Sequence, residues 1–217
     1  MAGCAVRSTD HVIVHFTHVR NLPGILAAGC LRADNRVDRR SALAVEAADL
    51  EIKSSRRAIR IGLAPFGCVA DYVPFYFAPR SPMLYKLAKG GVPTYAGGQD
   101  PLIYLVSTVG TVTDAGLRWL FSDGNCAATV TQVFDDCGLL DSVVDWQLMA
   151  ATMWKNTADD PDRMRRRMAE FLVYESVPLS CVAEIAVRTQ GMKEQVAALL
   201  AATTVRLPVR VRPNWYF

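Results

Sequence analysis

The sequence lacks the long apolar runs of a membrane protein and the apolar leader of an exported one. No window approaches the roughly 18–20 apolar residues of a membrane span, and the longest smooth apolar stretch is residues 196–202. The N-terminal MAGCAVRSTDH holds no apolar core of the kind that a signal peptide needs. We therefore expect a cytoplasmic protein with no membrane partner.

The sequence also lacks an excess of either charge. Its 217 residues include 24 Lys and Arg against 21 Asp and Glu, a formal net charge of +3, and 51% are hydrophobic. This balance excludes an intrinsically disordered chain, while 14 Gly and 11 Pro exclude collagen-like and low-complexity classes. Neither a repeat nor a linker interrupts the chain, so we expect one domain over residues 1–217. Any basic surface must come from local clustering.

No CxxC pair and no GxGxxG, GxxxxGKS, GxSxG or HExxH motif occurs in the chain. The commonest phosphate-binding, serine hydrolase and metalloprotease signatures are therefore absent. The six cysteines are dispersed. Without an export signal, we expect reduced thiols that serve mostly as small core side chains.

What is present is a mixture of β-branched, aromatic segments and short helical ones. They favour an α+β fold, because the strands seldom alternate with long helices, as a doubly wound parallel sheet would require. Asn21 is expected to cap a first helix and Gly29 to end it. Pro74 has no N–H group, so its strand should be an edge strand or a bulged one. The predicted strands are residues 11–19, 69–78, 102–109, 171–177, 184–189 and 205–211. The predicted helices are residues 22–28, 41–50, 83–88, 113–117, 132–140, 145–156, 162–169 and 193–201.

All three histidines, His11, His15 and His18, lie close together in the first predicted strand. A zinc site is tempting, but a strand separates His11 from His15 by about 13 Å, and no Cys or acidic cluster stands beside them at ligand spacing. We expect no metal. Two interpretations stay open: His11 and His15 are a surface residue and a polar strand-end residue, or His15 and Thr17 face a pocket where the Asn21 helix begins.

Basic residues form two local runs, residues 53–60 and 163–167. A charge run is usually a solvated helix face. Beside the aromatic segment 72–77, the two runs would also suit a single-stranded nucleic acid, with phosphates on the arginines and bases stacked on the rings. Alternate aromatic residues can equally form core, since opposite faces of a strand serve different purposes. The polar segment 34–60 is long for a loop, which indicates a partly helical or functional role.

Glu170 stands where the second basic run passes into an apolar strand. A lone carboxylate at such a junction usually caps a helix, pairs with an arginine or faces water. Composition and spacing alone therefore indicate a soluble α+β domain with a candidate anion-binding face.

Six blocks of sequence, in order along nearly the whole chain, resemble one known family. They are residues 15–26, 71–85, 95–102, 121–125, 169–174 and 212–216, and the most specific stretch is PFYFAPRSPMLY. The chain resembles the DarT family, the DNA ADP-ribosyltransferase toxins of bacterial toxin–antitoxin pairs.

The resemblance implies an ADP-ribosyltransferase fold, a split and mostly antiparallel β-sheet around an NAD cleft with flanking helices. It implies that NAD is a substrate, that no metal takes part, and that ADP-ribose passes to a base of single-stranded DNA with release of nicotinamide. Thymine is the first choice of base, and guanine occurs in another branch of the family. The variable loop 122–132 should touch this base, and residues 34–60 should form a lid that NAD or DNA orders.

The resemblance assigns the catalytic roles to Glu170 and Arg56. Glu170 would stabilise the positive charge that builds on the ribose as its bond to nicotinamide breaks. It would also accept a proton from the attacking base nitrogen. Arg56 would hold a phosphate or polarise a base carbonyl, with the adjacent Arg57 as the alternative.

The resemblance also implies binding residues and partners. The implied NAD-binding residues are His15, Thr17, Asn21, Gly24, Ile25 and Arg56. The implied DNA-binding residues are Tyr76, Arg80, Met83, Asn125 and Arg166. The arginines should gather along the DNA, with acidic pairs such as residues 135–136 and 159–160 lying elsewhere. We expect a monomer that a DarG-like macrodomain antitoxin neutralises.

Three other functions stay open at this point. The same fold could act on RNA or protein, although the PFYFAPRSPMLY block argues for DNA. The chain could be an inactive module that binds single-stranded nucleic acid. A histidine-based metal hydrolase is the fourth hypothesis, and metal analysis would test it.

Overall fold

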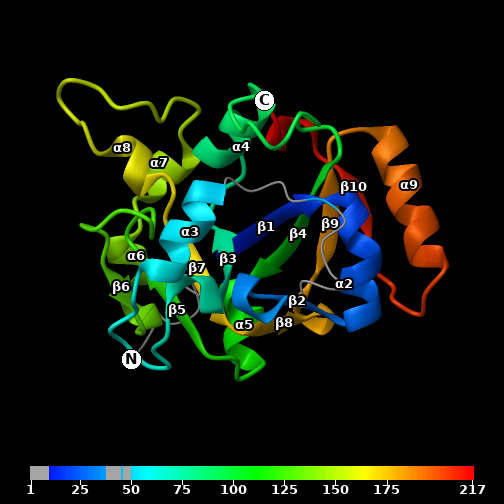
Figure 1. Cartoon of the computed structure of the whole chain (residues 1–217), viewed down its shortest axis with the longest axis horizontal. Helices are drawn as coiled ribbons and strands as arrows, with labels where there is room; N and C mark the ends of the chain where they lie inside the picture. Colours follow the sequence, from blue (N-terminus) through cyan, green and yellow to red (C-terminus); the bar gives the residue numbers. More distant parts are fainter. Residues whose placement is uncertain (1–9, 38–44, 46–49) are drawn as a thin grey trace.

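The chain is described from a computed structural model that covers residues 10–37, 45 and 50–217. Its main sheet orders eight strands as β10-β9-β4-β1-β3-β7-β5-β6, and β2 pairs with β8 in a second sheet (Figure 1). All pairings in the main sheet are antiparallel except that of β10 with β9. The strands are β1 (Val12–His18), β2 (Cys30–Arg32), β3 (Tyr72–Tyr76), β4 (Leu102–Thr108), β5 (Trp119–Ser122), β6 (Val133–Phe134), β7 (Glu170–Tyr174), β8 (Ser176–Pro178), β9 (Glu184–Val187) and β10 (Val209–Val211).

The main sheet is split between β1 and β3. β1 pairs with β4 along its whole length, and β3 pairs with β7 in the same way. Between β1 and β3, the register contains a single pair, Val14 with Tyr76. The two halves of the sheet are therefore joined at one point, which confirms the predicted α+β fold with a split, mostly antiparallel sheet.

Pro74 lies in this open seam. Its carbonyl oxygen accepts a hydrogen bond of 2.8 Å from His15 Nδ1, so the backbone polar groups of Pro74 face β1. The N–H that proline lacks would point into the seam, where no ladder partner is needed. The prediction of an edge strand is wrong, because β3 lies between β1 and β7 in the sheet. The side of Pro74 that lacks an N–H nevertheless faces the open seam, where the strand needs no donor.

Helices surround the sheet. In Figure 1, α3 lies in front of β3 and β7, α9 lies beside β9 and β10, and α7 and α8 lie at the opposite end of the molecule. The helices are α2 (Leu22–Ala28), α3 (Leu50–Ala58), α4 (Pro82–Ala88), α5 (Val109–Asp114), α6 (Leu140–Val143), α7 (Trp146–Ala150), α8 (Arg163–Arg166) and α9 (Gln190–Ala201). None of the described helices combines the length and apolarity that crossing a membrane requires.

The core lies on both faces of the sheet. In β4, Ile103 and Leu105 belong to one hydrophobic cluster, whereas Leu102, Tyr104 and Val106 belong to another. This alternation follows from the two-residue period of a strand. It explains why residues 102–106 read as a continuous apolar run, since both faces are covered.

Some predicted elements differ from the structure. The predicted helix at residues 132–140 is wrong: β6 pairs with β5 there, and the ring of Phe134 stacks on Phe121 at 5.2 Å. This long-range pairing outweighs local helix propensity. The last strand and the helices at 145–156 and 162–169 are shorter than predicted, and α5 begins at Val109 rather than 113. The predicted helix at 41–50 lies outside the described residues, apart from Val45 and Leu50.

Candidate active site

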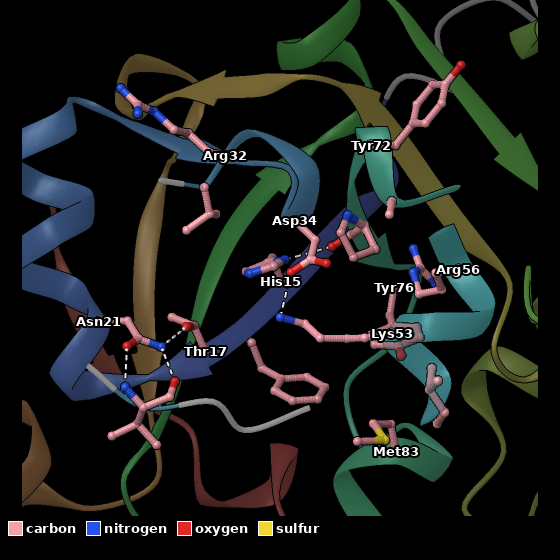
Figure 2. A pocket seen from close by; sticks show the side chains of 16 residues that line it. His15, Thr17, Asn21, Arg32, Asp34, Lys53, Arg56, Tyr72, Tyr76 and Met83 are labelled. Carbon is pink, nitrogen blue, oxygen red and sulfur yellow. Dashed lines mark hydrogen bonds and ion pairs between the residues drawn. The ribbon is translucent and has the colours of Figure 1, made fainter. Parts of the chain in front are cut away.

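A pocket opens at the seam between the two halves of the sheet. β1 supplies His15, Phe16 and Thr17, and β3 supplies Pro74 and Tyr76. Residues from the start of α2, from α3 and from α4 close the other sides (Figure 2). Because adjacent strands part here, side chains and backbone atoms that a continuous ladder would cover are open to a ligand. The interpretation that His15 and Thr17 face a pocket at the start of the Asn21 helix is confirmed.

Glu170, the first residue of β7, lies opposite Tyr76 in the strand register and is 1% exposed. Arg56 Nη1 donates to both of its carboxylate oxygens, at 3.0 and 2.8 Å. The backbone N–H of Cys126 also donates to Glu170 Oε1, at 3.3 Å. A buried carboxylate needs such partners, because losing its water is costly. These contacts supply hydrogen bonds that water would give to an exposed carboxylate.

Arg56 reaches Glu170 from the last turn of α3. Burial by itself would lower the pKa of Arg56, but the charge of Glu170 and the hydrogen bonds to it raise this pKa above its ordinary value. Its second terminal nitrogen, Nη2, is buried and has no hydrogen-bond partner among the described residues. Arg56 lines the pocket, so this nitrogen is a donor for a ligand oxygen.

The neighbouring Arg57 has a different partner. It forms an ion pair with Asp34, which also binds Lys53 Nζ at 2.5 Å (Figure 2). Asp34 thereby ties two successive turns of α3 to the segment after β2. Of the two adjacent arginines, Arg56 contacts Glu170, whereas Arg57 contacts Asp34.

His15 bridges the seam through its contact with Pro74. A carbonyl oxygen only accepts, so His15 Nδ1 carries the proton in this bond. Burial lowers the pKa of His15 from its ordinary value of 6.5; the bond to Pro74 opposes this shift and the charge of Arg56 adds to it. The imidazole is therefore neutral at pH 7, and Nε2 is left as a hydrogen-bond acceptor.

Asn21 holds the rim of the pocket together. Its Nδ2 donates to Thr17 Oγ1 at 3.2 Å and to the carbonyl oxygen of Val45 at 2.9 Å, and its Oδ1 accepts from the Val45 N–H at 3.0 Å (Figure 2). The side chain makes no capping bond to α2, contrary to expectation. Gly29 ends α2 at φ 68° as predicted. Gly24 is exposed, Ile25 packs on the core, and neither lines the pocket.

The predicted DNA-binding residues fall into two groups. Tyr76 and Met83 line the pocket, and burial raises the pKa of Tyr76, which keeps its hydroxyl protonated. Asn125 precedes Cys126 in the loop that touches Glu170, where its Oδ1 accepts from the Ala127 N–H. Arg80 lies outside the pocket, with its guanidinium over the ring of Phe217.

Arg166 lies on α8, where acidic partners surround it. Its guanidinium pairs with Asp145 at 3.0 Å and with Asp160. The neighbouring Arg165 pairs in the same way with Asp123 and Asp162. The expectation that residues 159–160 lie away from the arginines is therefore wrong. Aspartates that precede α8 in sequence fold back onto it and neutralise most of this basic run.

The other two histidines, His11 and His18, have different neighbours from His15. His11 stacks on Trp146 with ring centroids 3.6 Å apart, and its Nε2 lies 2.6 Å from Asp141. His18 Nδ1 accepts from the N–H of Arg20. In the described part of the chain, no three His, Cys, Asp or Glu side chains are grouped for a metal ion.

Sequence reasoning missed Asp34 and Lys53, which line the pocket. The signal that could have located them was the unusual length of the polar segment 34–60, but nothing in it distinguished one charged residue from another. Residues 38–44 and 46–49 of the predicted lid lie outside the described residues, and most of its second half forms α3.

Comparison with known proteins identifies relatives of this arrangement. The model of one protein family, described as "DarT: ssDNA thymidine ADP-ribosyltransferase, DarT", matches residues 14–217. A "DNA ADP-ribosyl transferase" of Mycobacterium tuberculosis is 37% identical over 211 residues, which cover 97% of this chain and 91% of that protein.

Solved structures agree with the sequence comparison. DarT of Thermus sp. 2.9 in complex with ADP-ribosylated ssDNA superposes with a TM-score of 0.88 at 36% identity, over 95% of this chain and 96% of that chain. The same protein in complex with NAD+ gives a TM-score of 0.84 at 35% identity, over 95% and 98%. A more distant relative is a "DNA ADP-ribosyl transferase-DNA ADP-ribosyl glycohydrolase fusion protein" of Thermosipho africanus, 26% identical over 94% of this chain and 49% of the fusion.

Proposed function

This chain belongs to the DarT family and is an NAD-dependent ADP-ribosyltransferase of single-stranded DNA, and we propose that thymine is the base it modifies and that Glu170 and Arg56 carry the reaction. The observation that supports these roles is the buried contact of Arg56 with both oxygens of Glu170 at the edge of the pocket. The family description supports thymine, since it names thymidine.

The first step breaks the bond between the ribose C1′ and nicotinamide. Positive charge builds on the ribose as the neutral nicotinamide leaves, and the Glu170 carboxylate stabilises this charge. Glu170 is suited to this role because it is 1% exposed. In such surroundings water screens its charge weakly, so its attraction for the cationic ribose is strong.

The second step joins C1′ to the base. In thymidine the one ring N–H is at N3, because N1 carries the sugar. N3 attacks C1′, and its proton passes to Glu170 acting as general base. Arg56 donates to a base carbonyl and draws electron density from N3, or holds a phosphate oxygen of NAD; the unpaired Nη2 of Arg56 supplies the donor in either case. The products are ADP-ribosylated DNA, nicotinamide and one proton.

The NAD-binding residues sit on the opposite side of the seam. His15 presents an acceptor nitrogen, and Thr17 and Asn21 form the adjoining wall of the pocket. A neutral histidine is favourable beside Arg56, because a second positive charge there would oppose the oxocarbenium ion. We also propose that Gly24 and Ile25, on α2, border the NAD-binding side of the pocket.

The test is direct transfer to defined oligonucleotides. Wild-type protein is incubated with NAD and single-stranded oligonucleotides that differ at one position, thymine or guanine, and an ADP-ribose mass increment is measured. We expect the increment on the thymine oligonucleotide and none on an RNA of the same sequence. The increment on guanine instead would reassign the base, and no increment on any oligonucleotide would contradict activity in this chain.

A charge-removing variant tests the role of Glu170. Glu170→Gln keeps the size and an acceptor oxygen and should lower transfer by about a hundredfold or more. The matched control is Glu175→Gln, at a surface carboxylate that pairs with Arg36. Both variants should bind NAD, and full activity of Glu170→Gln would reject the assignment.

We also propose the cellular setting. A DarG-like glycohydrolase would remove the modification. Support comes from the Thermosipho relative, which is named as a fusion of a DNA ADP-ribosyl transferase with a DNA ADP-ribosyl glycohydrolase. The protein would then be a monomeric toxin that acts in the cytoplasm, where DNA and NAD are both present. Light scattering tests the monomer, and loss of the mass increment on addition of a DNA ADP-ribosyl glycohydrolase tests the antagonist.

A further inference from the structure

The pairing of β5 with β7 stops one residue short of Glu170. The last pair in its register joins Phe121 with Phe171. Continuing this register would place Ser122, the last residue of β5, opposite Glu170, the first residue of β7. At this point the hydroxyl of Ser122 accepts a hydrogen bond of 3.0 Å from the Glu170 N–H. A side chain of β5 therefore holds the backbone of the residue that carries the buried carboxylate.

The same hydroxyl fixes the start of the loop that follows β5. Ser122 Oγ donates to the Gly124 carbonyl oxygen at 2.7 Å. A serine hydroxyl has one proton and two lone pairs, so it can donate to Gly124 and accept from Glu170 at the same time. The contact of 3.4 Å between Ser122 Oγ and the Glu170 carbonyl oxygen is longer and competes poorly for that proton. Ser122 is fully buried, so bulk water does not compete for these bonds.

The loop then returns to the carboxylate of Glu170. Two residues after Gly124, the backbone N–H of Cys126 donates to Glu170 Oε1 at 3.3 Å. Asn125 turns the chain between them, because its side-chain oxygen accepts from the backbone N–H two residues further on, at 2.9 Å. Burial raises the pKa of the Cys126 thiol, which therefore stays neutral beside Glu170. The contacts form a closed ring, from the Glu170 N–H through Ser122 and this turn to the Glu170 carboxylate.

Ser122 has no direct route to a substrate. It is fully buried, and it is not among the residues that line the pocket. Any influence of Ser122 on the reaction must therefore pass through Glu170. Such an influence can be large, because reacting groups work only within a narrow range of positions. A misplacement on the order of 1 Å can cost about a hundredfold in rate.

We propose that Ser122 is a positioning residue for the transfer of ADP-ribose. Its hydroxyl holds the Glu170 backbone and the turn at Gly124 together, so that the Glu170 carboxylate meets the Cys126 N–H on one side and Arg56 on the other. Support of this kind from behind keeps a reacting group in its productive place. This inference rests on the proposed function, in which Glu170 stabilises the ribose cation and accepts the proton.

A second buried serine provides a matched control for a purely structural role. Ser107, in β4, is also fully buried, and its hydroxyl donates to the Cys181 carbonyl oxygen at 2.6 Å. In the sheet, β1 and β3 separate β4 from β7. Removing the Ser107 hydroxyl therefore costs a buried hydrogen bond at a site remote from Glu170.

Steady-state transfer to a thymine oligonucleotide tests the inference. Ser122→Ala should lower kcat by about tenfold or more, while the KM for NAD changes by less than about twofold, because binding of NAD before the reaction does not use this hydroxyl. Ser107→Ala should keep the kcat of the wild type, although the urea midpoints of both alanine variants should fall. Ser122→Thr keeps the hydroxyl and should recover most of the lost kcat.

Three results would overturn the positioning role. They are a kcat of Ser122→Ala within about twofold of the wild type, an equal loss of kcat in Ser107→Ala, and a Ser122→Thr protein that is as stable as the wild type but no more active than Ser122→Ala. If Glu170→Gln is inactive while Ser122→Ala is normal, the positioning role fails and the proposed function stands. If the wild type transfers no ADP-ribose, the proposed function fails and this inference fails with it.

Discussion

Arg56 donates from one nitrogen, Nη1, to both carboxylate oxygens of Glu170, although α3 and β7 lie far apart in the chain. The contact has two consequences. It stabilises a carboxylate that is almost wholly removed from water, and it leaves Nη2 of the same guanidinium without a partner among the described residues. The two charges of the pair thus offset each other, but one buried donor, Nη2, has no acceptor among the described residues. A buried donor without an acceptor is costly, so a ligand oxygen that binds to it would be favourable.

Replacing the guanidinium by an ammonium should separate the two adjacent arginines. Arg56→Lys keeps the charge beside Glu170 but loses the second donor, so we expect kcat to fall by about tenfold or more while the protein stays folded. Arg57→Lys is the matched control, because lysine can still pair with Asp34. Steady-state transfer to a thymine oligonucleotide measures both. Equal losses for the two variants would argue against the assignment of Arg56.

Removing the charge of Asp34 should weaken the attachment of α3, because Asp34 pairs with two residues of that helix. Asp34→Asn loses the ion pairs with Lys53 and Arg57, and we expect a loss of about 1–3 kcal/mol in the free energy of unfolding. Arg56 should also be held less well against Glu170, so that kcat falls by a factor of several while the affinity for DNA changes little. Asp162→Asn is the control, since Asp162 also contacts two arginines but lies away from the pocket. A similar loss of kcat in the control would show a general effect of stability.

His15 should make the protein less stable as the pH falls. In the unfolded chain His15 takes up a proton near pH 6.5, whereas burial holds its pKa lower in the folded protein. Between those two values the unfolded state binds more protons, so the free energy of unfolding falls as the pH falls, and the contribution is fully present above pH 6.5. His15→Gln, which can still donate to Pro74, should show a smaller decrease. Urea unfolding at about pH 7.5 and about pH 5.5 measures it, and equal decreases in both proteins would reject this role.

Arg166, one of the predicted DNA-binding residues, already has acidic partners in the folded protein. Asp145 and Asp160 already bind the guanidinium of Arg166, so we expect Arg166→Gln to leave the salt slope of oligonucleotide affinity unchanged. The free energy of unfolding should fall by no more than about 1 kcal/mol, because these pairs are partly exposed. A slope that falls by about 0.7 would show that the DNA displaces the aspartates.

Local pattern was sufficient for much of the fold. The β-branched and aromatic run at β1 and the apolar run at β4 predicted both strands to within about two residues, because each strand has a covered face and a strong intrinsic preference. The sequence blocks that resemble the DarT family predicted the split sheet and the NAD substrate. The passage from a basic run into an apolar run predicted that Glu170 lies at the start of a strand. The segments where prediction failed, such as residues 132–140, are short and take their structure from a pairing with a distant strand.

The sequence by itself determined the family and its chemistry, because these depend on residue types at recognisable spacings. Only the tertiary structure decided which charges meet. It placed Arg56 rather than Arg57 on Glu170, brought Asp34 beside Lys53, and covered most of the α8 arginines with aspartates while leaving Arg167 without one. Attraction between charges falls with distance and depends on burial. Neither the distance between two charges nor their burial can be read from the order of residues. Both follow from how the two halves of the sheet and their helices pack.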